Sequence, residues 1–347
     1  MNLDIALWLT QDAVTTGAVY ALLALALVLV YTVTRVIFVP QGEFISYAAL
    51  SLATLQAGKV PGTIYLLLAG GTLIALLDGL SALRAARPRR AIGIVMFNIG
   101  VPAAIAGAAS LAALRPDHLL LQMLVAVSIV TAFGPIVYRL AFEPLPGASV
   151  LVLLIIAVAV HYLLTGLGLV FFGGEGLRTQ ALSDYSLRVG VLNITAQSLL
   201  VVCSSILLIL LLWLLFERTL YGKALRAAAI NRIGARLVGI SAPFAGSLSF
   251  TLAAFIGAIA GILISPITTI YYDTGFLISL KGFVGAIVGG MVSYPLAAAG
   301  ALLVGFLESF ASFWWSEFKE SIVFSLIIPV LLWRSLAAQR PEEEEEE

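Results

Sequence analysis

The chain has 347 residues, of which 61% are hydrophobic and only 11% are charged, and its 19 basic residues balance its 19 acidic ones. Soluble domains carry roughly 25% charged residues, so this composition excludes a water-soluble globular protein. A net charge of zero gives no basic field for nucleic acid. One cysteine, Cys203, excludes an internal disulfide, and the two histidines, His118 and His161, show no metal-ligand spacing. We therefore expect an all-α, polytopic bundle of transmembrane helices without a metal or cofactor.

The N-terminus, MNLDIALWLTQD, lacks the positive start and the small-residue cleavage site of a secretory signal, so the first apolar segment is expected to be a retained span. A bilayer core requires about 20 apolar residues per helix, or fewer where helices are short or broken. About eleven segments qualify. They cover residues 13–33, 42–55, 61–83, 91–114, 119–138, 150–170, 196–216, 246–264, 276–292, 296–313 and 321–333.

Arginine and lysine are concentrated in alternate loops, which sets the orientation by the positive-inside rule. Arg84, Arg87, Arg89 and Arg90 follow the third segment, and further basic residues lie in loops of the same parity. This pattern predicts an external N-terminus and a cytoplasmic C-terminus. We expect a single transmembrane domain over residues 1–340 and a disordered acidic tail over residues 341–347.

The sequence contains no chemistry-bearing arrangement typical of an enzyme. No G-x-x-x-x-G-K-[ST] run is present, so the chain has no phosphate-binding loop of its own. No nucleophile with a base beside it is recognisable either. Enzymatic activity is not expected, and any ATP hydrolysis would belong to separate polypeptides.

The longest basic loop, residues 217–243, has an amphipathic pattern. Leu225, Ala229, Ile233 and Leu237 recur every four positions, while arginines lie off that stripe. The pattern predicts one or two short helices at the membrane surface. Such helices either rest on anionic lipid headgroups or form a docking surface for a cytoplasmic partner.

Within this loop, YGKALRAAAINRIGARLVGI resembles the cytoplasmic coupling loop of permeases from branched-chain amino-acid ABC importers, the high-affinity leucine/isoleucine/valine systems. The matching positions are Tyr221, Gly222, Lys223, Ala224, Arg226, Ala227, Gly239 and Ile240. The resemblance implies that the loop docks into a groove on an ATP-binding subunit. It assigns coupling to Tyr221, Gly222, Lys223, Arg226, Ala227 and Gly239.

The run RVIFVPQGEF is similar to the family's Ile-Asn-Phe-Ala-His-Gly-Glu motif. Ile37, Gly42 and Glu43 keep that motif in register. Phe38, Pro40 and Gln41 depart from it, at the positions of the family's Asn, Ala and His, which puts an inherited polar role there in doubt. Pro40 is expected to break the helix. Glu43 either faces the protein interior or caps a helix N-terminus at the interface.

A zwitterionic substrate would need polar contacts at discontinuous helices. The candidates are the break at Pro40, Gln41, Gly42 and Glu43, and the loop SPITTIYYDTGFLISLKG, which holds Asp273 and Gly275. This loop is expected to be a re-entrant segment, or else to present Tyr271 and Tyr272 as an interfacial aromatic pair.

Other polar residues within the spans are given structural interpretations. His161 is expected to bond a neighbouring backbone carbonyl, with a role as substrate ligand as the alternative. Asp78 is expected to pair with Arg84, and Glu308 to lie at the interface. Glycines in residues 282–308 are expected to let helices approach closely. That run also resembles the family. Together with the first span and the loop that begins at Tyr138, the resemblance covers residues 17–55 and 138–334, but not 61–114. Residues 61–114 are expected to be an inserted two-helix hairpin that faces lipid or contacts a partner.

Taken together, the resemblance implies a multi-pass permease subunit of an ATP-driven importer in the cell's inner membrane. Its substrates would be branched-chain or related hydrophobic amino acids. Its partners would be a second homologous permease, two cytoplasmic ATP-binding subunits, a periplasmic substrate-binding protein and membrane lipid. Importers of urea, amides or aromatic acids remain alternatives, as does an ATP-independent channel or secondary transporter.

Overall fold

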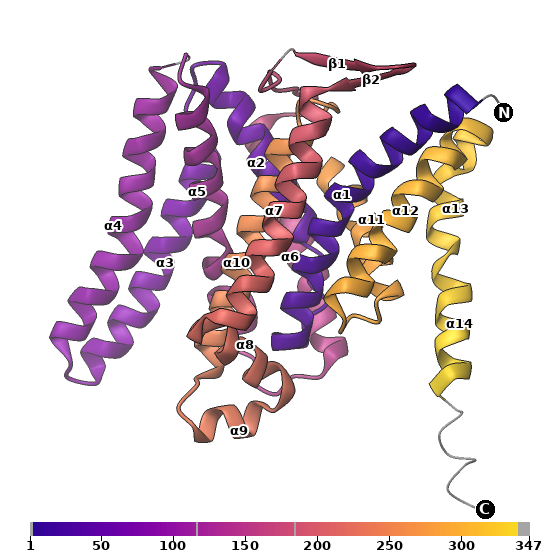
Figure 1. Ribbon diagram of the computed structural model, residues 1–347. Coiled ribbons are helices and arrows are strands. Elements are labelled where there is room, and N and C mark those ends of the chain that lie inside the picture. The colour runs from indigo at the N-terminus through magenta and orange to yellow at the C-terminus, as the bar shows by residue number, and fades with distance from the viewer. Residues whose placement is uncertain (1–2, 116, 184, 339–347) are drawn as a thin grey trace, which may run out of the picture. The chain divides into compact units, whose positions relative to one another are not determined.

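The computed structural model describes residues 3–115, 117–183 and 185–338, so the expected acidic tail at 341–347 lies outside the described residues. The described chain is almost entirely helical, with one small β-hairpin (Figure 1). The strands are β1 Ser186–Val189 and β2 Leu192–Thr195, which pair antiparallel. The helices are α1 Leu3–Thr34, α2 Gln41–Gln56, α3 Thr63–Arg84, α4 Pro88–Ala113, α5 Leu119–Val137, the π-helical turn η1 Tyr138–Phe142, α6 Val150–Phe172, α7 Ala196–Arg218, α8 Leu220–Ile230, α9 Arg232–Leu237, α10 Ala242–Ile264, α11 Thr274–Val288, α12 Tyr294–Trp314, the 3₁₀ turn η2 Ser316–Phe318, α13 Lys319–Ser325 and α14 Ile327–Ala338.

Eight helices of the described chain are long and apolar enough to cross a membrane, namely α1, α3, α4, α5 with η1, α6, α7, α10 and α12. Three expected segments form shorter helices instead. Residues 42–55 lie in the 16-residue α2, and residues 276–292 lie mostly in the 15-residue α11. Residues 321–333 are divided at Leu326 between α13 and α14. The all-α, polytopic class is therefore confirmed, while the number of spans and their orientation stay predictions.

The chain divides into two compact units, each made of separate stretches of sequence. Unit 1 comprises residues 1–28, 183–209 and 278–347, and unit 2 comprises residues 29–182 and 210–277. Both candidate sites of the sequence analysis fall within unit 2. We describe each unit by itself.

The core of unit 2 is an aromatic cluster between α2, α5 and α10. The ring of Phe38 lies 4.7 Å from that of Phe250 and 5.4 Å from that of Phe44. Phe250 also lies 5.3 Å from Phe142. Ring pairs at these separations add to the stabilisation from burial. Phe38, which departs from the family's Asn, thus has a packing role.

Close approach of the backbones in unit 2 depends on glycine. A Cβ atom at Gly134 of α5 would collide with the Phe250 carbonyl of α10, and one at Gly261 of α10 would collide with the Ile45 carbonyl of α2. Such small residues let helices in lipid pack with their backbones in contact. Alongside, α3 and α4 form an antiparallel hairpin that also contacts α5 (Figure 1).

Unit 1 confirms the expected role of the glycines in residues 282–308. A Cβ at Gly285 of α11 would meet Ala301 of α12, and one at Gly305 of α12 would meet the backbone of Ala13 and Gly17 in α1. A buried ion pair lies in the same unit: Lys281 Nζ donates to Glu308 Oε1 at 2.5 Å. The Tyr20 hydroxyl donates to the other Glu308 oxygen at 2.5 Å. Glu308 thus balances the charge of a buried lysine, while its expected interfacial position stays a prediction.

Candidate translocation and coupling sites

The first candidate site begins at the break between α1 and α2. The helix α1 ends at Thr34, and Arg35 adopts a positive φ of 62° that turns the chain. Pro40 has φ −71° and immediately precedes the first residue of α2. Proline has no amide hydrogen and suits a position just outside a helix. The predicted break at Pro40 is therefore present, and Glu43 falls in the first turn of α2.

Two helix starts meet at this break through bare backbone. A Cβ at Gly42 would collide with the Gly275 carbonyl, and a Cβ at Gly275 would collide with the Gly42 carbonyl. The Gly275 amide donates to Ser46 Oγ at 2.9 Å. Only glycine permits this approach, so the sequence places Gly42 and Gly275 opposite each other. The structure thus brings together two segments that the sequence analysis singled out separately.

Glu43 is buried at this junction, with 1% of its surface exposed. Its Oε1 lies 2.6 Å from His161 Nδ1 of α6 and accepts from the Thr165 hydroxyl at 3.3 Å. Its Oε2 has no partner among the described residues. A carboxylate in an apolar interior requires paired charge or hydrogen bonds. One oxygen of this buried carboxylate therefore has unused acceptor capacity.

The structure corrects the expectation for His161. We expected its ring to bond a neighbouring backbone carbonyl, whereas it bonds the Glu43 carboxylate and lies 4.4 Å from the ring of Phe276. Of the two interpretations of Glu43, the structure favours the interior one, since Glu43 is buried and its Oε1 contacts His161 and Thr165. An ionisable residue predicted in mid-span was the available signal that His161 belongs to this site.

The remaining pathway candidates differ in placement. Gln41 is fully buried, and its Nε2 donates to the Ala253 carbonyl of α10 at 3.0 Å. Pro40 is buried beside it. Asp273 is exposed just before α11, and its carbonyl accepts from the Phe276 amide. Gln41, Gly42, Glu43 and Gly275 therefore form one cluster, from which the Asp273 carboxylate is set apart.

The second candidate site is the loop that follows α7, which folds into α8 and α9. Thr219 accepts from the Gly222 amide at 3.0 Å, and Asn231 accepts from the Gly234 amide at 2.9 Å. These side chains cap α8 and α9 respectively. The helix breaks at Asn231, so the apolar residues spaced four apart do not share one continuous face. Leu225 is buried in α8, whereas Ile233 and Leu237 of α9 are exposed. The loop thus contains two short helices, one of the two outcomes that the amphipathic pattern predicted.

The residues with predicted coupling roles divide into two kinds. Gly222 is buried where α8 leaves α7, and a Cβ there would collide with the Leu215 carbonyl. Gly239 ends the loop with φ +89°, a conformation that favours glycine. Tyr221, Lys223 and Arg226 are exposed, and Ala227 is half-buried. The two glycines thus fix the path of the loop, and the three long side chains lie on its surface.

The surface of α8 and α9 combines basic and apolar groups. Arg226 Nη2 donates to Glu217 Oε1 at 2.7 Å. Several large apolar side chains are exposed around these charges. They are Leu220, Tyr221, Ile230, Ile233, Leu237 and Val238. Exposed large apolar side chains concentrated on two short helices are typical of an interaction site.

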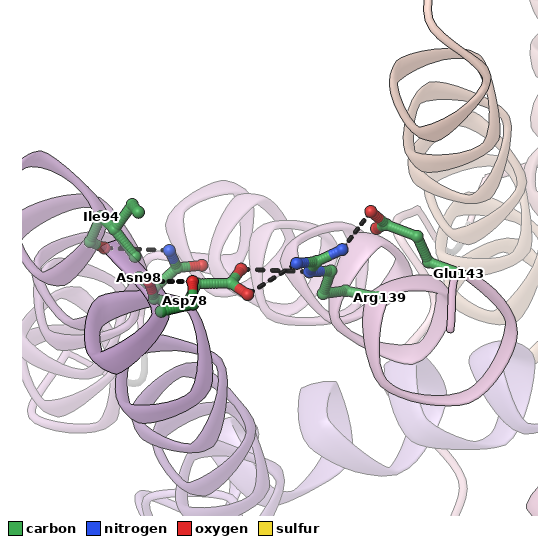
Figure 2. A network of polar contacts seen from close by, with 6 residues as sticks. Asp78, Ile94, Asn98, Arg139 and Glu143 are labelled. Atoms are coloured by element: carbon green, nitrogen blue, oxygen red, sulfur yellow. Dashed lines mark hydrogen bonds and ion pairs between the residues drawn. The ribbon is translucent and has the colours of Figure 1, made fainter. Parts of the chain in front are cut away.

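A third polar cluster joins α3 to the end of α5 (Figure 2). Arg139 Nη2 and Nε donate to the two Asp78 oxygens at 2.6 and 3.1 Å, and Nη1 donates to Glu143. The expected Asp78–Arg84 pair is therefore wrong, because Arg139 is held opposite Asp78 by packing of α3 against α5. Burial raises the pKa of the Glu143 carboxyl above its ordinary value, and Arg139 offsets part of that rise.

Within residues 3–115, 117–183 and 185–338, no three His, Cys, Asp or Glu side chains come together as a metal site requires. The clusters instead are hydrogen-bonded acids with histidine or arginine. They can hold a cationic or zwitterionic group, or stabilise the fold.

Residues 96–332 match the family described as the branched-chain amino acid transport system permease component. The chain belongs to this family. The matched range contains the coupling loop and the start of α11, and it begins inside α4. The chain is thus a transport permease component and a multi-pass membrane protein.

Curated relatives carry similar descriptions. The high-affinity branched-chain amino acid transport system permease protein BraD of Pseudomonas aeruginosa is 29% identical over 250 residues, which cover 69% of this chain and 81% of the relative. The permease protein LivH of Escherichia coli K12 is 28% identical over 214 residues, or 60% and 70% of the two chains. The probable LivH of Methanocaldococcus jannaschii is 31% identical over 196 residues, or 54% and 61%. No solved structure matches the chain.

Proposed function

We propose that this chain is the membrane-spanning subunit of an ATP-driven importer of branched-chain or related hydrophobic amino acids in the inner membrane. The family match over residues 96–332 carries this proposal. BraD and LivH are named as permeases for branched-chain amino acids, and we extend that substrate class to this chain. Its partners would be a second homologous permease, two cytoplasmic ATP-binding subunits and a periplasmic substrate-binding protein.

In this proposal, α8 and α9 receive the ATP-binding subunit. Their exposed apolar residues and the basic groups Lys223 and Arg226 would enter a groove on that subunit. The close contact of Gly222 with the Leu215 carbonyl supports this role, because it fixes α8 against the end of α7. Closure of the ATPase would then move the end of α7 as a rigid body. The loop would be cytoplasmic, in keeping with the predicted orientation.

The proposed pathway site is the cluster of Gln41, Gly42, Glu43 and Gly275. Two helix starts meet there, and the amino-terminal ends of broken helices are where transporters hold zwitterionic substrates. Glu43 Oε2, which has no partner among the described residues, could accept from a substrate ammonium group. Pro40 would maintain the break, and Asp273, whose carboxylate is set apart from the cluster, would contact the substrate outside it.

The docking surface can be tested with two matched substitutions. Leu237 in α9 is 84% exposed, and Leu114 at the C-terminal end of α4 is 79% exposed. The complete transporter would be co-expressed and purified through this chain with either Leu237→Glu or Leu114→Glu. We expect Leu237→Glu to lower the co-purified ATP-binding subunit by about tenfold, because a carboxylate would enter an apolar groove. Leu114→Glu should leave recovery unchanged.

Two results would oppose the proposal at different points. If the unaltered chain recovers no ATP-binding subunit, the importer assignment fails. If the unaltered chain recovers the ATP-binding subunit but the Leu237→Glu variant recovers the same amount, the docking surface lies elsewhere. The substrate class is tested separately, by uptake of leucine, isoleucine and valine with urea, a short amide and an aromatic acid as competitors.

A further inference from the structure

Unit 2 contains a lateral pocket of about 770 Å³ between α3, α4, α5 and α10. Ligand pockets in proteins typically have volumes of about 300–1,000 Å³. Most of the wall is apolar and comes from all four helices. Its large apolar members are Ile74, Phe97, Val101, Leu124, Ile136 and Phe255. The pocket is therefore large enough for part of a lipid-sized ligand.

One end of this pocket is charged. Asp78, Arg139 and Glu143 line it, and their side chains are 25%, 39% and 17% exposed. Asn98 of α4 stands beside Asp78 (Figure 2). Two carboxylates around one guanidinium give this end a net charge of −1. Deeper in the pocket, the Thr131 hydroxyl has no hydrogen-bond partner among the described residues.

The charged end lies near the ends of two helices in the pocket wall, α3 and the α5 span. Asp78 comes six residues before Arg84, the last residue of α3, which corresponds to about 9 Å along the helix. Arg139 likewise lies in the π-turn that ends the α5 span. Ile74 lies near the middle of α3, and Leu124 lies toward the opposite end of the α5 span from Arg139. The pocket thus has a polar end beside these helix ends and an apolar wall that continues along the spans.

We propose that this pocket binds a phospholipid whose headgroup is zwitterionic and carries a primary amine. The ammonium would donate to the carboxylates of Asp78 and Glu143. The phosphate would accept from the N–H groups of Arg139 that do not bond these carboxylates. Arginine has five such groups, and three bonds to carboxylates are present. One acyl chain would follow the apolar wall.

The charge balance selects this headgroup over the other common ones. A headgroup that is only anionic would face an excess carboxylate, and a choline headgroup has no N–H to donate. An arginine exposed to hydrocarbon is costly, so a polar occupant stabilises the site in a membrane. This site is separate from the proposed pathway, so its test does not depend on the importer assignment.

Native mass spectrometry of the purified full chain can count bound lipids. Phosphatidylethanolamine, phosphatidylglycerol and phosphatidylcholine with identical acyl chains would be titrated separately. We expect one site that prefers phosphatidylethanolamine by about tenfold, the size of effect that charge-assisted hydrogen bonds give. Equal or tighter binding of phosphatidylglycerol would overturn the proposal.

Two variants and two controls locate the site. Asp78→Asn removes one carboxylate, and Ser128→Phe fills the pocket without touching the charges. Each should weaken the preferred binding by about tenfold. Asp4→Asn is the control for Asp78→Asn, because it makes the same substitution at an exposed acid. Ser110→Phe is the control for Ser128→Phe, because Ser110 is an exposed serine of α4 whose hydroxyl, like that of Ser128, donates to the carbonyl four residues earlier. Both controls should bind like the unaltered chain. Unchanged binding in Ser128→Phe would refute this location even if Asp78→Asn failed to fold.

Discussion

Glu43 is the residue on which the proposed pathway depends most. Its carboxylate is buried, pairs with His161 and Thr165 through one oxygen, and keeps the other oxygen without a partner in the described chain. A buried acid with spare acceptor capacity is costly for stability. Such a cost is tolerated where the group has a function, and intramembrane acids commonly line transport routes.

We predict that Glu43→Gln lowers transport more than it lowers stability. The amide keeps the size of the side chain and a hydrogen bond to His161, but it offers no charge to a substrate ammonium. Initial uptake of radiolabelled leucine by cells with the complete transporter should fall by about tenfold or more. Thermal unfolding of the purified complex should change little.

Glu175→Gln provides the control, because Glu175 is an exposed acid outside the cluster. Uptake by this variant should equal that of the unaltered chain. If Glu43→Gln transports normally, the carboxylate has a packing role alone and Glu43 is not part of the pathway.

At the scale of elements, the contact of Gly42 with Gly275 fixes where α2 meets the start of α11. Neither glycine has space for a Cβ, since each would strike the carbonyl of the other. By contrast, Gly166 in the middle of α6 has no atom within 4 Å of a built Cβ. The same substitution therefore has opposite physical consequences at these positions.

Gly42→Ala and Gly275→Ala should each lower the free energy of unfolding by about 1–3 kcal/mol, because overpacking pushes the two helix starts apart. Gly166→Ala should leave it unchanged or raise it by about 0.5–1 kcal/mol, because alanine is the better helix former. Thermal melting of the three variants in detergent measures this difference. Equal melting temperatures for all three would show that the two helix starts are not in contact.

At the scale of the whole molecule, each compact unit contains its own buried ion cluster. Unit 2 has Glu43 with His161, and unit 1 has Lys281 with Glu308. The Lys281 and Glu308 side chains are almost covered, whereas the Arg226–Glu217 pair is about half exposed. Breaking a buried pair leaves an uncompensated charge, while breaking an exposed pair leaves two solvated groups.

Glu308→Gln should therefore destabilise the protein by about 3–5 kcal/mol, because it removes the close partner of the buried Lys281 ammonium and leaves only Glu320, at 4.0 Å, as a counter-charge. Arg226→Ala should hardly change the unfolding transition. Adding Lys281→Met to Glu308→Gln should restore part of the loss, which a double-mutant cycle of melting temperatures would measure. Additive effects of Lys281→Met and Glu308→Gln would contradict a direct pair.

Local pattern explains what could be predicted of the fold. Hydropathy located the long helices because a span in lipid must satisfy its backbone hydrogen bonds within the helix and present apolar side chains. Both requirements fall on consecutive residues, which a sequence shows directly. Pro40 marked the break before α2 for an equally local reason, its missing amide hydrogen. Sequence also suggested the proposed coupling loop, by residues that lie within one short segment. It did not predict that Asn231 would divide that loop into two helices.

The sequence alone therefore determined the membrane class, most helix positions, the family resemblance and the candidate segments. Tertiary structure alone decided which polar groups meet. His161 and Glu43 are 118 residues apart, and Arg139 and Asp78 are 61 apart. No helical period encodes such distances, so nearby partners such as Arg84 were the natural but wrong expectation. A polar group in a span bonds whichever partner helix packing brings within reach, because an unpaired group there is costly.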